Sequence, residues 1–168
     1  AAVIGHRGAA GPDGMPVTAL REHLQKHGEA IKRKLLTGSY VPAAARRVEI
    51  AKATGGTRGL NIPNVVDRFV QQLLVQVLTP HLDPQMSPSS FGFRPGRSAH
   101  DAVRQAQAYA REGCDWVVDM DIEAFFDRVN HDVLMRRLTR DVQDRRALKL
   151  INRMLSAGHI LPQGEVVR

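Results

Sequence analysis

The sequence has one cysteine, few aromatic residues and no long apolar run. Cys114 cannot form an internal disulfide, which suits a reducing compartment, and we expect a cytoplasmic protein. No stretch of about 18 apolar residues could span a bilayer, and the apolar start at residues 1–4 is too short for a signal peptide. Internal repeats and low-complexity tracts are also lacking. These absences argue against a disulfide-rich secreted module, a membrane protein or a repeat array, and no membrane partner is expected.

Positive charge is in excess. The 168 residues carry 24 Lys and Arg against 17 Asp and Glu, which gives a net charge of +7 and a pI near 10.3. Such a balance suits an acidic partner such as nucleic acid, although net charge informs about partners and not about fold. The length fits one domain with a sizeable core.

Residues 116–122 read WVVDMDI, with carboxylates at every second position. This alternation predicts a β-strand that carries Asp119 and Asp121 on one face and apolar residues on the other. Carboxylates at the end of a strand can hold Mg²⁺, which prefers hard oxygen ligands. Acids in such a pair are more often solvated than metal-bound, so on these residues alone both interpretations stay open.

Apolar residues recur at helical spacing in several stretches. In residues 17–37 we expect Gly28 to divide the run into two helices and Gly38 to end it. The cations of this stretch form either a solvated face or a phosphate-tracking surface. The clearest amphipathic stripe, residues 66–78, is expected to be core and to end at Pro80. Further helices are expected at residues 99–110, 133–138 and 147–155.

A β-hairpin is predicted for residues 46–62, with a Gly55-Gly56 turn between two alternating stretches. Lys52 and Arg58 lie near its tip on opposite arms. A Lys and an Arg that converge there could bind a triphosphate, or they could be solvated charges that protect a sheet edge from aggregation.

A loop rich in Pro and Ser follows the amphipathic stripe and delivers two aromatic and two basic residues. Phe91 and Phe93 could stack on unpaired bases, although we favour their role as loop anchors in the core. Arg94 and Arg97 are expected to contact a nucleic-acid backbone. Arg68, in the pair Asp67-Arg68, is either part of a charge arrangement that favours the helix dipole, which we prefer, or a template contact.

Four ordered blocks resemble one known family. Residues 121–131, DIEAFFDRVNH, are similar to the first catalytic motif of reverse transcriptases encoded by group II introns, and residues 8–14, 55–72 and 90–101 resemble the fingers motifs of that family in the same order. The resemblance implies an α+β fold. Residues 1–112 would form right-hand polymerase fingers, with helices and a β-hairpin, and residues 113–168 a partial palm that stops before the second catalytic motif.

The resemblance also implies an activity. Members of the family are RNA-directed DNA polymerases that use two Mg²⁺ ions, with Mn²⁺ as an alternative. Their partners are an RNA template, a DNA or RNA primer, a dNTP and the intron RNA. It makes Asp121 the catalytic, metal-binding acid, with the backbone carbonyl of Ile122 as a further ligand. Asp119 is a neighbour of undefined role. The remaining roles by resemblance are nucleotide binding for Lys52, Arg58 and Phe126, and nucleic-acid binding for Arg68, Arg94 and Arg97.

Two departures from the family pattern bear on activity. Residues 58–63 read RGLNIP where the family usually reads RPLGIP, and the second acidic motif is lacking. Because Asp121 alone cannot hold two metal ions, and the chain does not begin with Met, we expect a fragment that does not polymerise DNA by itself. Other classes remain as alternatives: a non-catalytic RNA-binding, maturase-like module, and a metal-dependent sugar-nucleotide transferase, which the four ordered blocks argue against.

Overall fold

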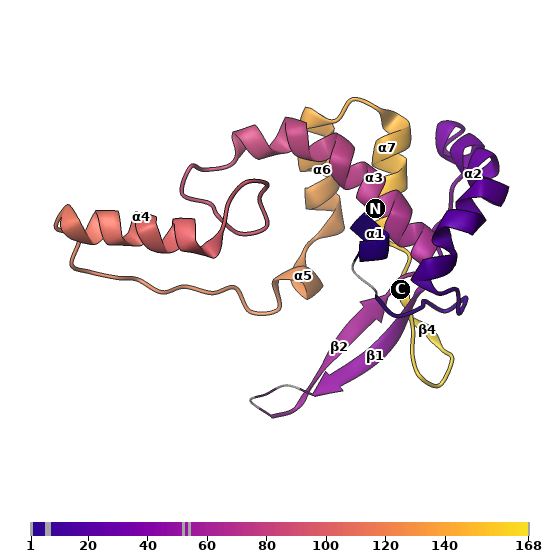
Figure 1. Ribbon diagram of the computed structural model, residues 1–168, viewed down its shortest axis with the longest axis horizontal. Coiled ribbons are helices and arrows are strands. Elements are labelled where there is room, and N and C mark those ends of the chain that lie inside the picture. Colours follow the sequence, from indigo (N-terminus) through magenta and orange to yellow (C-terminus); the bar gives the residue numbers. More distant parts are fainter. Residues whose placement is uncertain (1, 6–7, 52, 54, 168) are drawn as a thin grey trace. The chain divides into compact units, whose positions relative to one another are not determined.

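The computed structural model describes residues 2–5, 8–51, 53 and 55–167, and its fold is α+β, as expected (Figure 1). The chain divides into two compact units. Unit 1 comprises Ala1–Gln76 and His131–Arg168, and unit 2 comprises Val77–Asn130. The boundary between fingers and palm near residue 112 stays a prediction, because compact units and polymerase subdomains are different divisions of a chain.

Unit 1 begins with α1 (Ala2–Gly5), the short 3₁₀ helix η1 (Val17–Ala19) and α2 (Leu20–Leu36). The expected break at Gly28 is wrong, because α2 runs through it. A glycine inside a helix costs only about 1 kcal/mol, and good helix formers surround this one. Gly38 ends the helix as expected, with φ of 63°, while Ser39 N–H donates to the Lys34 carbonyl at 2.8 Å.

The predicted hairpin is confirmed. Strands β1 (Ala45–Ala51) and β2 (Thr57–Ile62) pair antiparallel from Arg46 opposite Ile62 to Ala51 opposite Thr57. Two further strands, β3 (His159–Ile160) and β4 (Val166–Val167), complete a sheet in the order β2-β1-β3-β4, with β3 parallel to β1. Sequence patterns missed β3 and β4 because two residues are too few to show alternation.

The apolar core of unit 1 lies where α2 meets the start of α3 (Val65–Leu82). Val17, Leu20 and Val65 form its buried cluster, and Phe69 packs against them. The expected core stripe on α3 is only partly right, because Val70 is buried while Leu73 and Val77 are exposed. The expected end at Pro80 is wrong too. Pro80 removes one hydrogen bond in the last turn, which the helix tolerates.

Helices α6 (His131–Asp141) and α7 (Arg145–Leu155) complete unit 1. Asp144 caps α7 by accepting hydrogen bonds from the N–H groups of Arg146, at 2.7 Å, and Ala147, at 3.3 Å. Hydrogen bonds from Arg146 lower the pKa of Asp144 to about 2. In turn, α7 holds the end of α2, since Arg153 donates to the Gly38 and Tyr40 carbonyls at 2.9 and 2.6 Å.

Unit 2 contains η2 (Asp83–Gln85), α4 (Ala99–Arg111) and α5 (Phe125–Arg128). Ser98 and Asp101 form a reciprocal capping box at the start of α4, which fixes where that helix begins. The chain leaves α4 at Gly113, with φ of 92°. None of the helices described is long and apolar enough to cross a membrane.

Candidate active-site residues

The acidic segment does not form the strand that its sequence predicts. Residues 114–122 have no regular secondary structure, and Trp116, Val118 and Met120 are 94%, 77% and 85% exposed. A strand needs a neighbour for its N–H and C=O groups, and within the described residues no strand pairs with this segment. The alternating pattern is real, but the hydrogen-bonding partner that it requires is lacking from the described fold.

Asp119 and Asp121 are both exposed in this segment. One oxygen of Asp121 accepts a hydrogen bond from the N–H of Ile122 at 2.9 Å, which orients the carboxylate along its own backbone. A left-handed turn at Ala124, with φ of 50°, leads into α5. There Phe126 is 87% exposed and its ring meets Phe125 edge-on at 5.2 Å. The segment therefore presents Asp121 and Phe126, five positions apart in sequence, as exposed side chains.

The donor atoms at this position suit a hard cation. The Asp121 carboxylate and the Ile122 carbonyl are oxygen ligands of the kind that Mg²⁺ prefers. No group of three or more His, Cys, Asp or Glu gathers as a metal site among the described residues. These donors therefore fit one side of a Mg²⁺ site that other oxygens complete, and they are too few to hold two ions.

The hairpin carries the expected nucleotide-binding cation on β2. Arg58 is exposed and lies opposite Ile50, so it shares the face of Val48 and Leu60. Its proposed partner Lys52 lies outside the described residues. The convergence of the two side chains on one anion therefore stays a prediction.

The departure at position 59 has a structural counterpart. A Cβ on Gly59 would collide with the guanidinium of Arg47, which lies across β2 at that point. Arg47 also reaches His159, with 3.3 Å between its Nη1 and the Nε2 of that residue. The space that a side chain would occupy on β2 is therefore filled by an arginine that links three strands of the sheet.

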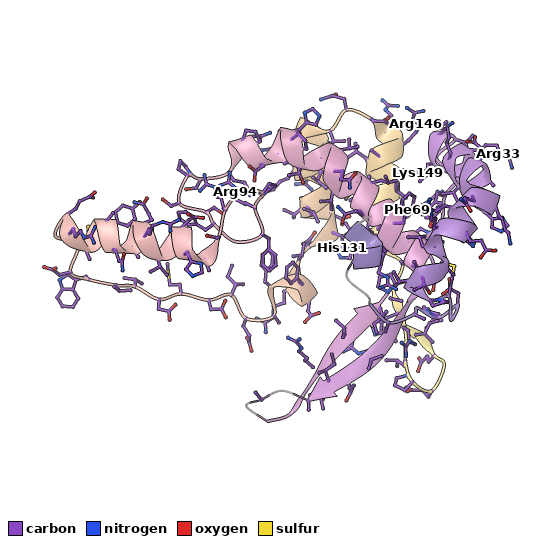
Figure 2. All side chains as sticks on the ribbon, in the orientation of Figure 1. Arg33, Phe69, Arg94, His131, Arg146 and Lys149 are labelled. Atoms are coloured by element: carbon purple, nitrogen blue, oxygen red, sulfur yellow. The ribbon has the colours of Figure 1, made fainter. Side chains whose placement is uncertain are left out.

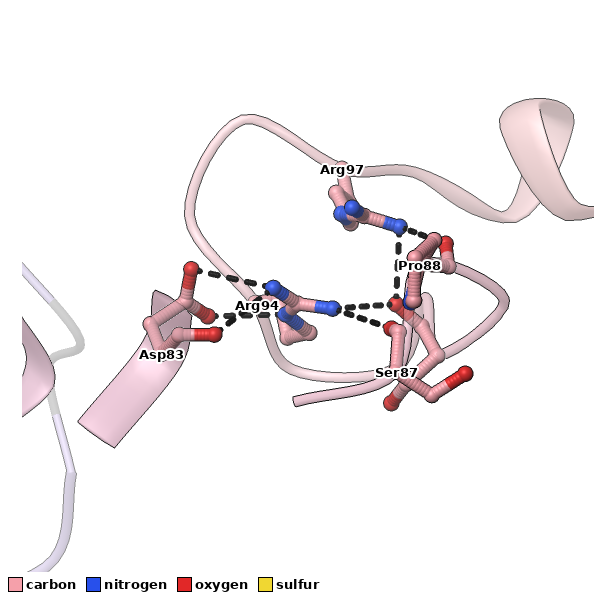
Figure 3. Close-up of polar contacts among 6 residues, drawn as sticks. Asp83, Ser87, Pro88, Arg94 and Arg97 are labelled. Atoms are coloured by element: carbon pink, nitrogen blue, oxygen red, sulfur yellow. Dashed lines mark hydrogen bonds and ion pairs between the residues drawn. The ribbon is translucent and has the colours of Figure 1, made fainter. Parts of the chain in front are cut away.

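Arg94 organises the loop of unit 2 (Figure 3). Its Nε and Nη2 donate to the Asp83 carboxylate at 2.8 and 3.2 Å, and Nη2 also donates to the Asp83 carbonyl at 2.9 Å. Nη1 donates to the carbonyls of Ser87 and Ser90 at 2.8 and 3.0 Å. A guanidinium has five N–H groups, so all are engaged. The bond from Arg94 holds the pKa of Asp83 below its usual value. Arg94 can meet a phosphate only by giving up one of these bonds.

Arg97 lies in the same loop, and only its Nη1 donates hydrogen bonds among the described contacts. Its Nη1 donates to the carbonyls of Pro88 and Ser90, and its guanidinium lies 5.3 Å from the ring centre of Phe91. Phe91 is partly buried, which agrees with a loop anchor. The same expectation for Phe93 is wrong, because that side chain is fully exposed on a residue with φ of 56°. No described contact occupies Nε or Nη2 of Arg97, which leaves those groups for a phosphate.

Arg68 anchors the loop that precedes α2. Its Nη2 donates to the Ala9 carbonyl at 2.6 Å, and a Cβ on Gly8 would collide with the guanidinium. Its Nε is buried with no partner among the described residues. The side chain that the resemblance assigned to the template is therefore turned inward in unit 1.

The neighbouring Asp67 lies in the first turn of α3, as the helix-dipole interpretation requires, and it is also a buried structural residue, which sequence reasoning missed. Asp67 is 4% exposed and accepts hydrogen bonds from the Tyr40 hydroxyl at 2.7 Å and the Ala43 N–H at 3.2 Å. Burial raises the pKa of Asp67 and that of Tyr40. The signal was available, because an acid beside Val66 and three residues before Val70 lies on the buried side of the helix.

The excess positive charge of the chain and the cations of its hairpin suit an acidic partner such as nucleic acid. Comparison with known proteins gives the family. Residues 50–167 match the family model described as reverse transcriptase (RNA-dependent DNA polymerase), and the chain belongs to this family.

Relatives of this chain come from introns and from a bacterial genome. Protein YkfC of Escherichia coli is 34% identical over 172 residues, which cover 94% of this chain and 45% of that protein. Group II intron-encoded protein LtrA of Lactococcus lactis is 33% identical over 133 residues, or 77% of this chain and 22% of LtrA. The uncharacterized 91 kDa protein in the cob intron of Schizosaccharomyces pombe is 38% identical over 133 residues, 73% of this chain and 16% of that protein. The chain thus spans less than half of each of these relatives, and the resemblance to group II intron reverse transcriptases is confirmed.

Proposed function

We propose that the chain is part of an RNA-directed DNA polymerase of the group II intron type, which adds dNTPs to a DNA or RNA primer on an RNA template. Residues 1–112 supply fingers and residues 113–168 the start of the palm. The observation that carries the proposal is the exposed Asp121 carboxylate, beside the Ile122 carbonyl and close in sequence to the exposed Phe126, within the region that matches the family.

Each residue has a proposed task that follows from its chemistry. Asp121 and the Ile122 carbonyl hold Mg²⁺, which when bound stabilises charge on the attacking and leaving oxygens. Lys52 and Arg58 neutralise the triphosphate of the dNTP, and the Phe126 ring limits the space beside its sugar. Arg97 contacts the nucleic-acid backbone through the guanidinium atoms that the loop leaves uncommitted.

A second candidate is a non-catalytic, maturase-like RNA-binding module that binds intron RNA. It is supported by the lack of a gathered set of three metal-binding side chains among the described residues. Nuclear intron maturase 1 of Arabidopsis thaliana is 36% identical over 93 residues, 55% of this chain and 13% of that protein. On this candidate, the acids of residues 116–122 have no role in function.

Primer extension on an RNA template with Mg²⁺ separates the two. The chain is assayed alone and then mixed with a polypeptide that supplies the second acidic motif from a related enzyme. We expect extension only in the mixture, and a loss of at least about a hundredfold with Asp121→Asn, because a carboxylate ligand is removed. Asp115→Asn is the matched control, since it makes the same charge change at an exposed acid of the same segment.

The outcomes point in different directions. Full extension by the Asp121→Asn mixture would contradict the assignment of the metal ligand, and extension by the chain alone would contradict the expected need for a second acidic motif. RNA binding that is unaffected by Asp121→Asn, in a mixture that never extends a primer, supports the maturase-like module.

A further inference from the structure

Most of the net charge of the chain lies in two short helices of unit 1. Residues 136–153 contain seven cations and two acids, so they contribute +5 of the total +7. The remaining 150 residues contribute only +2. The cations are Arg136, Arg137, Arg140, Arg145, Arg146, Lys149 and Arg153.

Two of these cations serve the fold. Arg146 pairs with Asp144 at 2.9 Å, and Arg153 donates to carbonyls at the end of α2. The other five are exposed and have no ion pair with a described residue. We call these five the basic helical face: Arg136, Arg137, Arg140, Arg145 and Lys149.

Helix α2 has a similar number of cations but a different arrangement. Lys26 pairs with Glu22 at 2.7 Å, and Lys32 lies 3.6 Å from Glu29, both on the same helix. Acids on α2 therefore partly neutralise its cations. Asp132 and Asp141 lie four residues from Arg136 and Arg137 on α6, but no ion pair joins them among the described residues, so the five cations of the basic helical face remain available to a partner.

The spacing of the face is regular. Arg136 and Arg140 on α6, and Arg145 and Lys149 on α7, are four residues apart and thus about 6 Å apart along each helix axis. Figure 2 shows Arg146 and Lys149 on the short α7. The contacts of Arg146 and Arg153 with α2 hold α7 in unit 1. Arg145 and Lys149 are therefore carried on a helix that is held against the end of α2.

We propose that the basic helical face binds the phosphate backbone of a folded RNA. Four of its five cations are arginines, whose planar fork matches two phosphate oxygens at once. A membrane surface is a poorer match, because Val133 is the one exposed large hydrophobic side chain among the described residues 131–155. The inference rests on the proposed function for the identity of the nucleic acid, and it adds a docking surface made of residues other than Asp121, Arg58 and Phe126.

The test measures binding of the whole chain to a 20-base-pair RNA duplex by fluorescence anisotropy over a range of KCl concentrations. The variant Arg136→Gln/Arg140→Gln/Lys149→Gln removes three cations of the face. We expect its affinity to fall about tenfold or more, and the slope of log K against log salt to become shallower by about 2 to 3, because each lost phosphate contact removes about 0.9.

The matched control removes three cations from α2: Lys26→Gln/Lys32→Gln/Arg33→Gln. It has the same net charge as the first variant, and we expect its affinity to stay within about threefold of the parent chain. Equal losses in the two variants would overturn the proposal, since net charge alone would then explain binding. Circular dichroism and thermal unfolding of both variants establish that α6 and α7 remain folded.

Further arms separate this inference from the proposed function. Asp115→Asn, an exposed acid outside both sites, should bind the duplex as the parent chain does, and if duplex binding depends on the basic helical face while no mixture extends a primer, the surface stands and the polymerase proposal fails. Primer extension in the mixture, together with undiminished duplex binding by the α6–α7 variant, would overturn the surface alone. Tighter binding to a polyglutamate peptide than to the duplex would assign the face to an acidic protein and likewise overturn it.

Discussion

Two segments of this chain have the same alternating pattern and different structures. Residues 45–51 and 57–62 form a paired hairpin, whereas residues 116–122, with an equally clear alternation, form no strand. Strand β1 pairs with β2 from Arg46 to Ala51 on one side, and its first two residues pair with β3 on the other. The comparison teaches that alternation reports which face of a strand would be buried, while a partner decides whether the strand exists.

Amide hydrogen exchange tests this contrast directly and should give the largest effect. We expect the paired amides of β1 and β2 to exchange at least roughly a hundredfold more slowly than those of residues 116–122, because exchange in a paired strand requires an opening event. Mass spectrometry of peptic peptides, or NMR, would measure both segments in one sample.

The same experiment can be sharpened by adding the polypeptide that supplies the second acidic motif. If a partner strand is what residues 116–122 lack, their exchange should slow in the mixture while that of the hairpin stays constant. Equal protection of both segments in the chain alone would break the comparison.

Asp67 on α3 and Asp121 in the acidic segment have different surroundings. Asp67 is buried and holds Tyr40 and the Ala43 N–H, whereas Asp121 is exposed and bonds only to the next backbone N–H among the contacts described. Asp67→Ala should lower the free energy of unfolding by about 3 kcal/mol, because two donors lose their acceptor in a buried site. Asp121→Ala should change it by less than about 0.5 kcal/mol. Urea unfolding of both variants checks the difference, and equal effects would contradict it.

The pH dependence of stability should carry a smaller signature of the same buried acid. Burial raises the pKa of Asp67 above its usual value, so the folded chain binds this proton more tightly than the unfolded chain does. The tighter proton binding of Asp67 therefore adds to the free energy of unfolding. This stabilisation is fully present below about pH 4, which is the pKa of Asp67 in the unfolded chain, and it is lost as the pH rises through the raised pKa of the folded chain.

Asp67→Asn provides the comparison, because it cannot titrate. The difference in unfolding free energy between the parent chain and this variant, measured by urea titration at several pH values, should shift in favour of the variant as the pH rises above 4. The acids with lowered pKa, Asp83, Asp101 and Asp144, act in the opposite direction and are common to both proteins, so they cancel in the difference.

Much of the fold could be predicted from local signals. The hairpin, the capped start of α4 at Ser98 and the left-handed end of α2 at Gly38 each depend on neighbours in sequence. Sequence reasoning failed where a distant partner decides: β3 pairs with β1 more than a hundred residues away, and residues 116–122 have no partner strand among the described residues.

The candidate site shows the same limit. Sequence reasoning identified Arg68 and Arg94 as cations able to bind nucleic acid. It could not show that Arg68 donates to the Ala9 carbonyl, or that all five N–H groups of Arg94 donate to residues of its own loop. Exposure is a property of the folded chain. Asp121, Arg58 and Arg97 keep donor or acceptor atoms available among the described contacts, whereas the nucleic-acid roles of Arg68 and Arg94 stay predictions that require these side chains to leave the bonds they now make.

The smallest predicted effect concerns Gly59 in the hairpin. Gly59→Ala should force the Arg47 guanidinium off β2 and away from His159, because the new Cβ would occupy its place. The stability change should be within about 0.5 kcal/mol, since a long side chain can move into solvent and alanine suits a strand better than glycine. The ¹⁵N chemical shifts of the His159 ring report loss of the contact with Arg47. We expect the shifts in Gly59→Ala to match those in Arg47→Gln. Shifts in Gly59→Ala that equal those of the parent chain would mean that the position of Arg47 does not depend on the lack of a side chain at residue 59. A hairpin that tolerates this change is held by its ladder of backbone bonds, which is what residues 116–122 lack.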